Sequence, residues 1–344
     1  ISFKISLSHG SGTGLYLDHR SIRYRLAELM KSTYPLPPLP APKPGVPTPK
    51  KAPKKIRRSK RYRQMGEVNV GDIPPVMIPS DDDPPTTTTV EAKEEEKGWM
   101  SVLNAFAYTG SYSLHMALTA QKEGILLKTV NMDVQRAVLD IAKENMERNG
   151  VDNVSVHHSF QRRDAFEAMA AMDRAHKRFE MVIVDPPSFA TVRRSGKKYT
   201  FTTRQHYAEV LATSLPLLKP GGHLVAIMQS HSFSMSKLLS DFEEAQKTVW
   251  SRKKAQLSLD KYVKTRHKLR QSKTIYKKER MRKLKDMSFQ AKDEVVQQYW
   301  RYDLVDHWTQ DIDFGYVDEA GQHLHAFVFQ RGLLPPNTPY YPSL

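Results

Sequence analysis

The feature that most constrains this chain is a regular alternation of short apolar runs with longer amphipathic stretches between Trp99 and Ser230. The apolar runs have the length and composition of buried strands, whereas the amphipathic stretches repeat apolar residues every three or four positions, as helices do. Strands are expected at 100–108, 126–133, 154–160, 179–185 and 223–230, and helices at 111–124, 134–150, 164–178 and 203–218. Strands that alternate with helices form a mostly parallel sheet covered on both faces, so the sequence predicts a doubly wound α/β fold.

This core occupies only part of the chain. Proline density, charge runs and missing periodicity between Tyr34 and Gly98 indicate an extended insertion. A later segment rich in Lys and Arg has good helix formers and neither proline nor glycine. We therefore divide the chain into an N-terminal strand and helix segment with an Asp-x-Arg motif (1–34), a Pro- and Lys-rich extended insertion (35–98), the core (99–250), a basic helical insertion (251–300), and closing strands with a C-terminal tail (301–344).

Composition excludes several kinds of site. The sequence has no cysteine, which rules out disulfides, thiolate metal sites and a thiol nucleophile within it. The histidines at 157–158, 323 and 325 lack a plausible set of further ligands, so no metal is expected. No apolar run is long enough for a membrane span, and no membrane partner is expected. The chain begins with Ile1, which a removed organellar leader would explain, so we expect a location in the mitochondrial matrix.

The net charge of +16 is concentrated in two blocks. Residues 41–64 hold ten Lys or Arg and no acid, and residues 252–285 hold fifteen with two acids, so the blocks carry +10 and +13 and the remaining residues −7. Cations interleaved with Tyr62, Tyr262 and Tyr276 favour contact with nucleic acid. The alternative is that both blocks are solvated segments without a partner.

Three acids follow successive expected strands, at the sheet edge where ligands bind in such folds: Asp133, Asp164 and Asp185. Asp133 lies 23 positions after Gly110, about the separation at which an acid meets ribose hydroxyls in nucleotide-binding units. Any of the three can instead be a helix N-cap, and this alternative applies most to Asp164. The turn 108–111 has one glycine where dinucleotide-binding loops have three. This favours a nucleoside cofactor without a pyrophosphate, such as S-adenosylmethionine.

The fourth expected strand ends in the stretch Asp185-Pro186-Pro187-Ser188-Phe189. Two prolines stop the sheet ladder and stiffen the backbone. A rigid corner is suited to methyl transfer, because in-line displacement depends mostly on the position of the acceptor. Asp185 or the backbone beside Pro186 can accept hydrogen bonds from a base amine. Phe189 either stacks on a base taken out of its helix or fills the core.

Five segments resemble, in order, the motifs of one family: GLYLDHRSIRYRL, VLNAFAYTGSYSL, VNMDVQRAVLDIAKENMERNG, RDAFE and VDPPSFA. The family is that of the class I S-adenosylmethionine-dependent methyltransferases related to the bacterial large-subunit rRNA enzymes that make 5-methylcytosine and 7-methylguanine. The resemblance covers roughly residues 10–30 and 99–235, with a fainter likeness in HLHAFVFQRG. It implies a Rossmann-like domain with S-adenosylmethionine as cofactor.

The resemblance also implies roles for individual residues. Asp133 would hold the ribose, Asp164 would lie near the adenine, and Asp18 with Arg20 would help to close the pocket or else form a surface salt bridge. The implied cofactor residues are Phe106, Tyr108, Gly110, Asp133, Asp164 and Arg20, and those bordering the methyl group and the target base are Asp185, Pro186, Pro187 and Phe189.

One departure from the family narrows the reaction. Methylation of cytosine at carbon 5 normally needs a cysteine that adds to the ring, and Gln229 stands about where the cysteine-bearing enzymes carry it. We therefore expect methylation of a base nitrogen in RNA, in particular rRNA, together with ribosomal proteins or assembly factors. The alternative is a catalytically silent methyltransferase-fold protein that serves as a structural or assembly component of a mitochondrial ribosome.

Overall fold

The computed structural model of the 344-residue chain describes residues 1–4, 16, 19–34, 98–151, 155–194, 197–229, 234–271, 293–309 and 324–333. Several predictions fall outside these ranges: Asp18, the insertion up to residue 97, the basic block 41–64, and the tail from residue 334 onward.

The described core is built on a seven-stranded sheet of order β3-β2-β1-β4-β7-β9-β8. Five strands are parallel, and β9 runs antiparallel to both β7 and β8. The strands are β1 (Met100–Ala105), β2 (Leu127–Asp133), β3 (Val156–Arg162), β4 (Phe179–Val184), β7 (Leu218–Gln229), β8 (Tyr302–Thr309) and β9 (Leu324–Arg331). Strand order reverses between β1 and β4, and this switch point is where open α/β sheets bind ligands.

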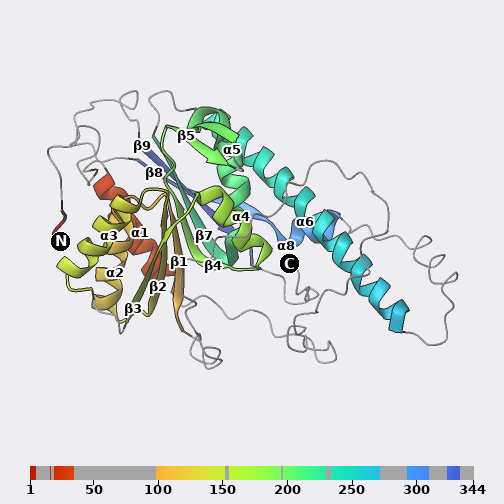
Figure 1. The fold of residues 1–344 in the computed structure, drawn as a ribbon, viewed down its shortest axis with the longest axis horizontal. Helices are drawn as coiled ribbons and strands as arrows, with labels where there is room; N and C mark the ends of the chain where they lie inside the picture. Colours follow the sequence, from red (N-terminus) through yellow and green to blue (C-terminus); the bar gives the residue numbers. More distant parts are fainter. Residues whose placement is uncertain are drawn as a thin grey trace.

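Helices cover both faces of the sheet (Figure 1). One face carries α1 (Arg20–Thr33), α2 (Ser111–Glu123) and α3 (Arg136–Arg148). The other carries α4 (Ala165–Arg174), α5 (Thr203–Ser214), the short 3-10 helix η3 (Leu215–Leu217), α6 (Met235–Gln271) and α8 (Asp293–Tyr299). The predicted doubly wound α/β fold is therefore confirmed. None of the described helices combines the length and apolarity that crossing a membrane requires.

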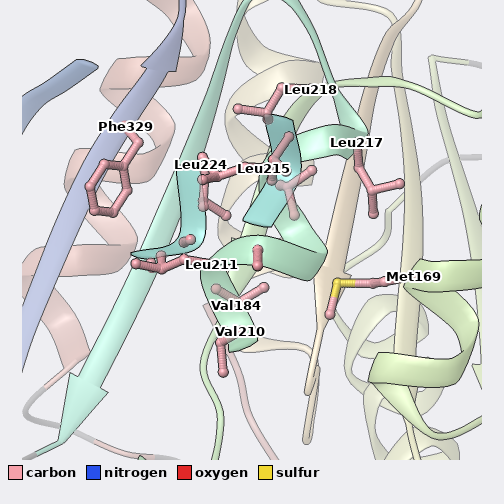
Figure 2. Packing of buried hydrophobic residues seen from close by; sticks show 14 of the residues in the cluster. Met169, Val184, Val210, Leu211, Leu215, Leu217, Leu218, Leu224 and Phe329 are labelled. Atoms are coloured by element: carbon pink, nitrogen blue, oxygen red, sulfur yellow. The ribbon is translucent and has the colours of Figure 1, made fainter. Parts of the chain in front are cut away.

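Successive residues of the central strands are buried on opposite faces, which is why β1 and β4 are mostly apolar. In β1, Val102 packs with the helices of one face and Leu103 with those of the other. Figure 2 shows part of the second cluster, where α4, α5, η3, β4, β7 and β9 contribute Met169, Val184, Val210, Leu211, Leu215, Leu217, Leu218, Leu224 and Phe329. This two-sided core fixes the carboxyl ends of β1, β2 and β4 next to one another.

Two local features of the described residues differ from what the sequence predicts. No strand is found over residues 1–4, where the backbone N–H groups of Ser2 and Lys4 instead donate to the Asn149 and Asn145 side chains at the end of α3. The hairpin that follows the Asp-Pro-Pro corner was also not predicted; it is formed by β5 (Phe189–Arg194) and β6 (Lys197–Thr202).

The expected boundary between core and basic insertion is also wrong, because α6 crosses it as one helix. Its apolar residues Leu238, Phe242, Ala245 and Val249 pack in the core, and the same spacing continues to Leu257. Lys253, predicted to be part of an unburied basic helix, is only 1% exposed and forms an ion pair with Asp173. The helical prediction itself is confirmed as far as Gln271.

Candidate active site

The loop between β1 and α2 has an unusual backbone. Phe106 and Tyr108 have φ values of 63° and 47°, in the left-handed region that costs non-glycine residues about 1 kcal/mol or more and is frequent at functional sites. Gly110 has φ 75°, and a Cβ there would lie 2.9 Å from the Cβ of Ala142 on α3. The loop therefore requires glycine at this position and is held close against α3. Phe106 is anchored by an edge contact with Phe166.

Asp133, at the end of β2, holds this loop. Its Oδ2 accepts from the Tyr108 N–H at 3.1 Å, and its Oδ1 accepts from the Gln135 N–H at 2.9 Å. Burial raises the pKa of Asp133, although the backbone N–H groups of Gln135, Tyr108 and Val134 oppose the shift. A half-buried carboxylate of this kind is stabilised by further hydrogen-bond donors, such as a pair of ligand hydroxyls.

Asp164 has a structural role. It is the N-cap of α4, where its Oδ1 accepts from the Glu167 N–H at 3.0 Å. The N-cap alternative raised by the sequence is therefore present, and the position of Asp164 near an adenine stays a prediction. The preceding Arg163 N–H donates to the Asp133 carbonyl, which places the ends of β2 and β3 side by side.

The Asp-Pro-Pro corner is pinned to α5. The Thr203 hydroxyl donates to the Pro187 carbonyl, and the Thr203 N–H donates to the Ser188 carbonyl, both at 3.1 Å. Phe189, the first residue of β5, is 65% exposed. The alternative that Phe189 fills the core is therefore wrong, and its ring is available to a ligand at the sheet edge.

Asp185 belongs to a buried polar cluster that the sequence did not reveal. The Tyr112 hydroxyl on α2 donates to Asp185 Oδ2 at 3.1 Å, and His19 Nδ1 lies 3.6 Å from the same oxygen and hydrogen-bonds the Tyr112 hydroxyl. Gln229 Nε2, at the end of β7, lies 3.4 Å from His19 Nε2. The one available signal was the place of His19 between Asp18 and Arg20.

Aromatic stacking joins this cluster to the loop between β1 and α2. The Tyr16 ring stacks on His19 at 5.2 Å between centroids and contacts Tyr108 at 5.4 Å. Arg20, the first residue of α1, is exposed beside His19. Tyr16 and His19 therefore lie against the edge that carries Asp133 and Asp185. Among the described residues, no group of three or more His, Asp and Glu side chains is arranged to hold a metal ion.

Tyr207 completes the environment of Asp185. It lies on α5, and burial, followed by the charges of Asp185 and Asp241, raises the pKa of its phenol well above 10. Its hydroxyl is buried and has no hydrogen-bond partner among the described residues. The Tyr207 side chain is therefore a neutral phenol beside a carboxylate.

Comparison with known proteins bears on the part of the chain that carries this site. Residues 90–252 match the family model of S-adenosylmethionine-dependent methyltransferases. This segment belongs to that family. The chain is 31% identical over 139 residues to ribosomal RNA large subunit methyltransferase I of Erwinia tasmaniensis, which covers 40% of this chain and 31% of the relative. It is 32% identical over 142 residues to ribosomal RNA large subunit methyltransferase K/L of Shewanella pealeana. That alignment covers 41% of this chain and 18% of the relative.

Solved structures support the fold. The chain superposes on SMU.776, a methyltransferase crystallised with SAH, with a TM-score of 0.52 at 16% identity, over 96% of this chain and 53% of that one. A SAM-dependent methyltransferase from Streptococcus mutans gives a TM-score of 0.51 at 15% identity over the same shares. The chain thus spans at most about a third of these two curated relatives and about half of these structures. For residues 90–252, the predicted S-adenosylmethionine-dependent methyltransferase family and its cofactor are confirmed, while the roles of individual site residues stay predictions.

Proposed function

We propose that this chain uses S-adenosylmethionine to methylate a nitrogen of a base in RNA, in particular rRNA. The observation that carries the proposal is the corner after β4, where two prolines stand between the Asp185 carboxylate and the exposed Phe189 ring at the switch point of the sheet. It lies at the same edge as the Asp133 loop, so a nucleoside cofactor and a flat acceptor can occupy adjoining places.

Asp133 and the loop between β1 and α2 fit the cofactor. Asp133 would accept hydrogen bonds from ribose hydroxyls, which offset the burial that raises its pKa. The strained residues Phe106 and Tyr108 and the close approach at Gly110 would shape the wall beside it. When bound, the cofactor supplies a methyl group on a positively charged sulfur.

The Asp-Pro-Pro corner fits a nitrogen acceptor. The lone pair of the base nitrogen forms the new bond to the methyl carbon, the sulfur keeps the electrons of the broken bond, and a proton then leaves the nitrogen. The Asp185 carboxylate can orient that N–H and accept its proton. Gln229, at the end of β7, offers an amide where addition to a cytosine ring would need a thiol, so carbon methylation by that route is disfavoured.

Several features support RNA as the substrate. The relatives named above are rRNA methyltransferases. The β5–β6 hairpin next to the corner carries Arg193, Arg194, Lys197 and Lys198 and no acid in its sequence. Phe189 lies at the base of this hairpin and the four cations lie at its turn. An exposed aromatic on the same element as basic residues suits a site that stacks a base and neutralises phosphates.

The test is product analysis. The protein is incubated with methyl-labelled S-adenosylmethionine and rRNA from a strain lacking the corresponding modification, and the RNA is digested to nucleosides and identified by mass spectrometry. We expect a nitrogen-methylated nucleoside. Phe189→Ala should raise the KM for RNA about tenfold or more, because base stacking contributes about 1–3 kcal/mol. Leu239→Ala, on an exposed apolar residue of α6, is the matched control. Formation of 5-methylcytosine would contradict the nitrogen assignment.

One observation favours the second candidate, a silent component of a ribosome or assembly intermediate. The far end of α6 extends well beyond the sheet (Figure 1), and its sequence over 261–271 is strongly basic. Calorimetric titration with S-adenosylmethionine separates the two: no heat of binding in a folded protein that retains rRNA would favour the silent component. Co-sedimentation with ribosomal subunits tests the proposed ribosomal partners, and fractionation tests the mitochondrial matrix.

The contribution of α6 to RNA binding is measured by a salt series. Replacing Lys261, Lys264, Arg266, Lys268 and Arg270 by Gln should flatten the dependence of RNA affinity on salt by about 0.7–0.9 in slope for each phosphate that is no longer neutralised. S-adenosylmethionine affinity should stay unchanged, because these residues follow the part of α6 that packs in the core. Equal slopes would show that this end of α6 is a solvated helix.

A further inference from the structure

We propose that His19 is a positioning residue for methyl transfer, which holds the Asp185 carboxylate through the Tyr112 hydroxyl in the orientation that receives the acceptor nitrogen. This rests on the proposed function, because Asp185 is there the group that faces the base. Nothing in the composition or spacing of the sequence pairs His19 with Asp185, which lies in a different part of the chain.

The contacts bring four separate elements to one point. His19 precedes α1, Tyr112 lies in the first turn of α2, Asp185 follows β4, and Gln229 ends β7. His19 Nδ1 hydrogen-bonds the Tyr112 hydroxyl and lies 3.6 Å from Asp185 Oδ2, which accepts from Tyr112 at 3.1 Å. His19 Nε2 lies 3.4 Å from Gln229 Nε2. Both ring nitrogens of His19 are therefore engaged.

The donors and acceptors of this cluster fix which way its hydrogen bonds run. The Gln229 amide nitrogen is only a donor, so its contact with His19 Nε2 requires a lone pair there. The ring hydrogen of neutral His19 then sits on Nδ1 and points to the Tyr112 oxygen and to Asp185. The Tyr112 hydrogen is left to donate to Asp185 Oδ2. Every donor has an acceptor, and the chain of hydrogen bonds ends on the carboxylate.

Burial and packing keep the ring in place. His19 is 2% exposed and Tyr112 is 4% exposed, so water does not compete for their hydrogen bonds. The His19 ring is stacked between Tyr16, at 5.2 Å, and Tyr112, at 5.8 Å between centroids. A ring fixed on both faces and at both nitrogens restricts the rotamer of its neighbour Asp185. A displacement of about 1 Å at such a group can lower a rate by about a hundredfold.

The first test needs no RNA substrate. The protein is labelled with 15N-histidine, and the His19 ring signals are identified by their loss in His19→Asn. Long-range proton–nitrogen correlation, recorded where the ring is neutral, should show its hydrogen on Nδ1. A neutral ring with its hydrogen on Nε2 would overturn the proposal, because Nδ1 would then have nothing to donate.

The second test compares three substitutions. The Asn amide can place its nitrogen near the position of Nδ1, whereas the Gln amide reaches the position of Nε2. We expect His19→Ala and His19→Gln to lower kcat about ten- to a hundredfold, and His19→Asn to restore it to within about threefold of the parent, with the affinity for S-adenosylhomocysteine kept within about twofold in all three. His223→Asn, at a buried histidine within β7, controls for the loss of a core imidazole.

Two further results separate positioning from structure. Tyr112→Phe combined with His19→Ala should lower kcat no more than the stronger single variant, because both act through Asp185. Equal losses in all three His19 variants, in step with their unfolding temperatures or cofactor affinity, would overturn the proposal. If the parent protein methylates no RNA, the proposed function fails, and the NMR experiment still decides the His19 geometry.

Discussion

The two ends of β4 carry buried polar clusters of opposite character. At the carboxyl end, His19 and Tyr112 converge on the single carboxylate of Asp185. At the amino end, three cations surround the Trp300 ring: Arg331 at 3.8 Å, Lys253 at 4.7 Å and Arg178 at 5.4 Å from its centroid. Both clusters are shielded from water, yet only the first lies at the edge where ligands bind.

The three cations of the Trp300 cluster find their partners within the protein. Lys253 Nζ lies 2.5 and 2.7 Å from the two Asp173 oxygens, and Arg178 lies 3.0 Å from the same carboxylate. Arg331 donates to the backbone carbonyls of Leu218 and Tyr299. Burial lowers the pKa of all three cations, although Asp173 opposes the shift. These contacts tie α4, α6 and β9 together.

A shifted pKa alone therefore does not mark a functional site. The pKa of Arg331 is lowered to about 10 by burial, yet its donors are taken up by main-chain carbonyls. The cluster around Asp185 instead adjoins an exposed aromatic ring and a strained loop. Location at the carboxyl ends of the strands separates the two clusters, so substitutions around Trp300 should change stability and a substitution at Asp133 should change ligand binding.

The largest effect is expected from Asp173→Ala. This change leaves Lys253 and Arg178 buried without their shared counter-charge, so it should lower the free energy of unfolding by about 3–5 kcal/mol. Urea denaturation measures the loss, and S-adenosylhomocysteine affinity of the folded protein should not change. Asp303→Ala, in the exposed pair with Arg301, should cost less than about 1 kcal/mol. A similar small loss for Asp173→Ala would mean that water reaches the Trp300 cluster.

The second-largest effect concerns the loss of stability at acidic pH. Burial lowers the pKa of His223, on β7, from 6.5 to about 4. The unfolded chain therefore takes up a proton before the folded one as pH falls, so stability present above pH 6.5 is lost between about 6.5 and about 4, by up to about 3 kcal/mol. Over this pH window, the free energy of unfolding obtained from denaturation curves should fall more steeply with decreasing pH for the parent protein than for His223→Asn. Identical pH dependence would show that this histidine is hydrated.

At the carboxyl ends of the strands, Asp133→Ala tests the cofactor site. It should weaken S-adenosylhomocysteine binding by about 1.5–3 kcal/mol, which is about tenfold or more, because a charged acceptor for two hydroxyls is removed. Calorimetry measures the affinity, and Asp140→Ala, at an exposed carboxylate on α3, is the control. Unchanged affinity for Asp133→Ala would place the pocket elsewhere and remove the distinction between the two ends.

The smallest effect is expected from Asp164, which has a structural contact at the ligand-binding edge. Asp164→Ala removes the N-cap of α4 and should lower stability by about 1 kcal/mol, whereas Asp164→Asn keeps a capping oxygen and most of that stability. Parallel calorimetry decides the predicted second role. A loss of cofactor affinity in both variants supports a place near the adenine, and full affinity in both leaves Asp164 as a cap.

The fold was predictable because its signals are local. Strands such as Phe179–Val184 are apolar at every position except Glu180 since both faces are covered, and helices such as Arg136–Arg148 repeat their buried residues at the helical period. The acids at strand ends could be placed for the same reason. The missed β5–β6 hairpin did carry a weak signal, since Ser195-Gly196 separates two short runs that contain β-formers.

The missed parts of the site depend on contacts between distant segments. His19 is 93 residues from Tyr112 and 210 from Gln229, so no local pattern connects them. Lys253 stands in a run of cations in the sequence, and only folding shows that it is the one that turns toward Asp173 and Trp300. Charge composition predicts how much basic surface a chain has, but it does not predict which cations are withdrawn from that surface.

The continuity of α6 has a geometric consequence. The helix has no break between Leu257, which is buried in the core, and Gln271. At about 1.5 Å per residue, that stretch is a stiff rod of about 20 Å whose base is clamped by the domain. A polyanion bound near its tip would be held at a set distance and angle from the Asp-Pro-Pro corner. The helix would then act as a ruler that selects which nucleotide of a folded RNA reaches the reaction centre.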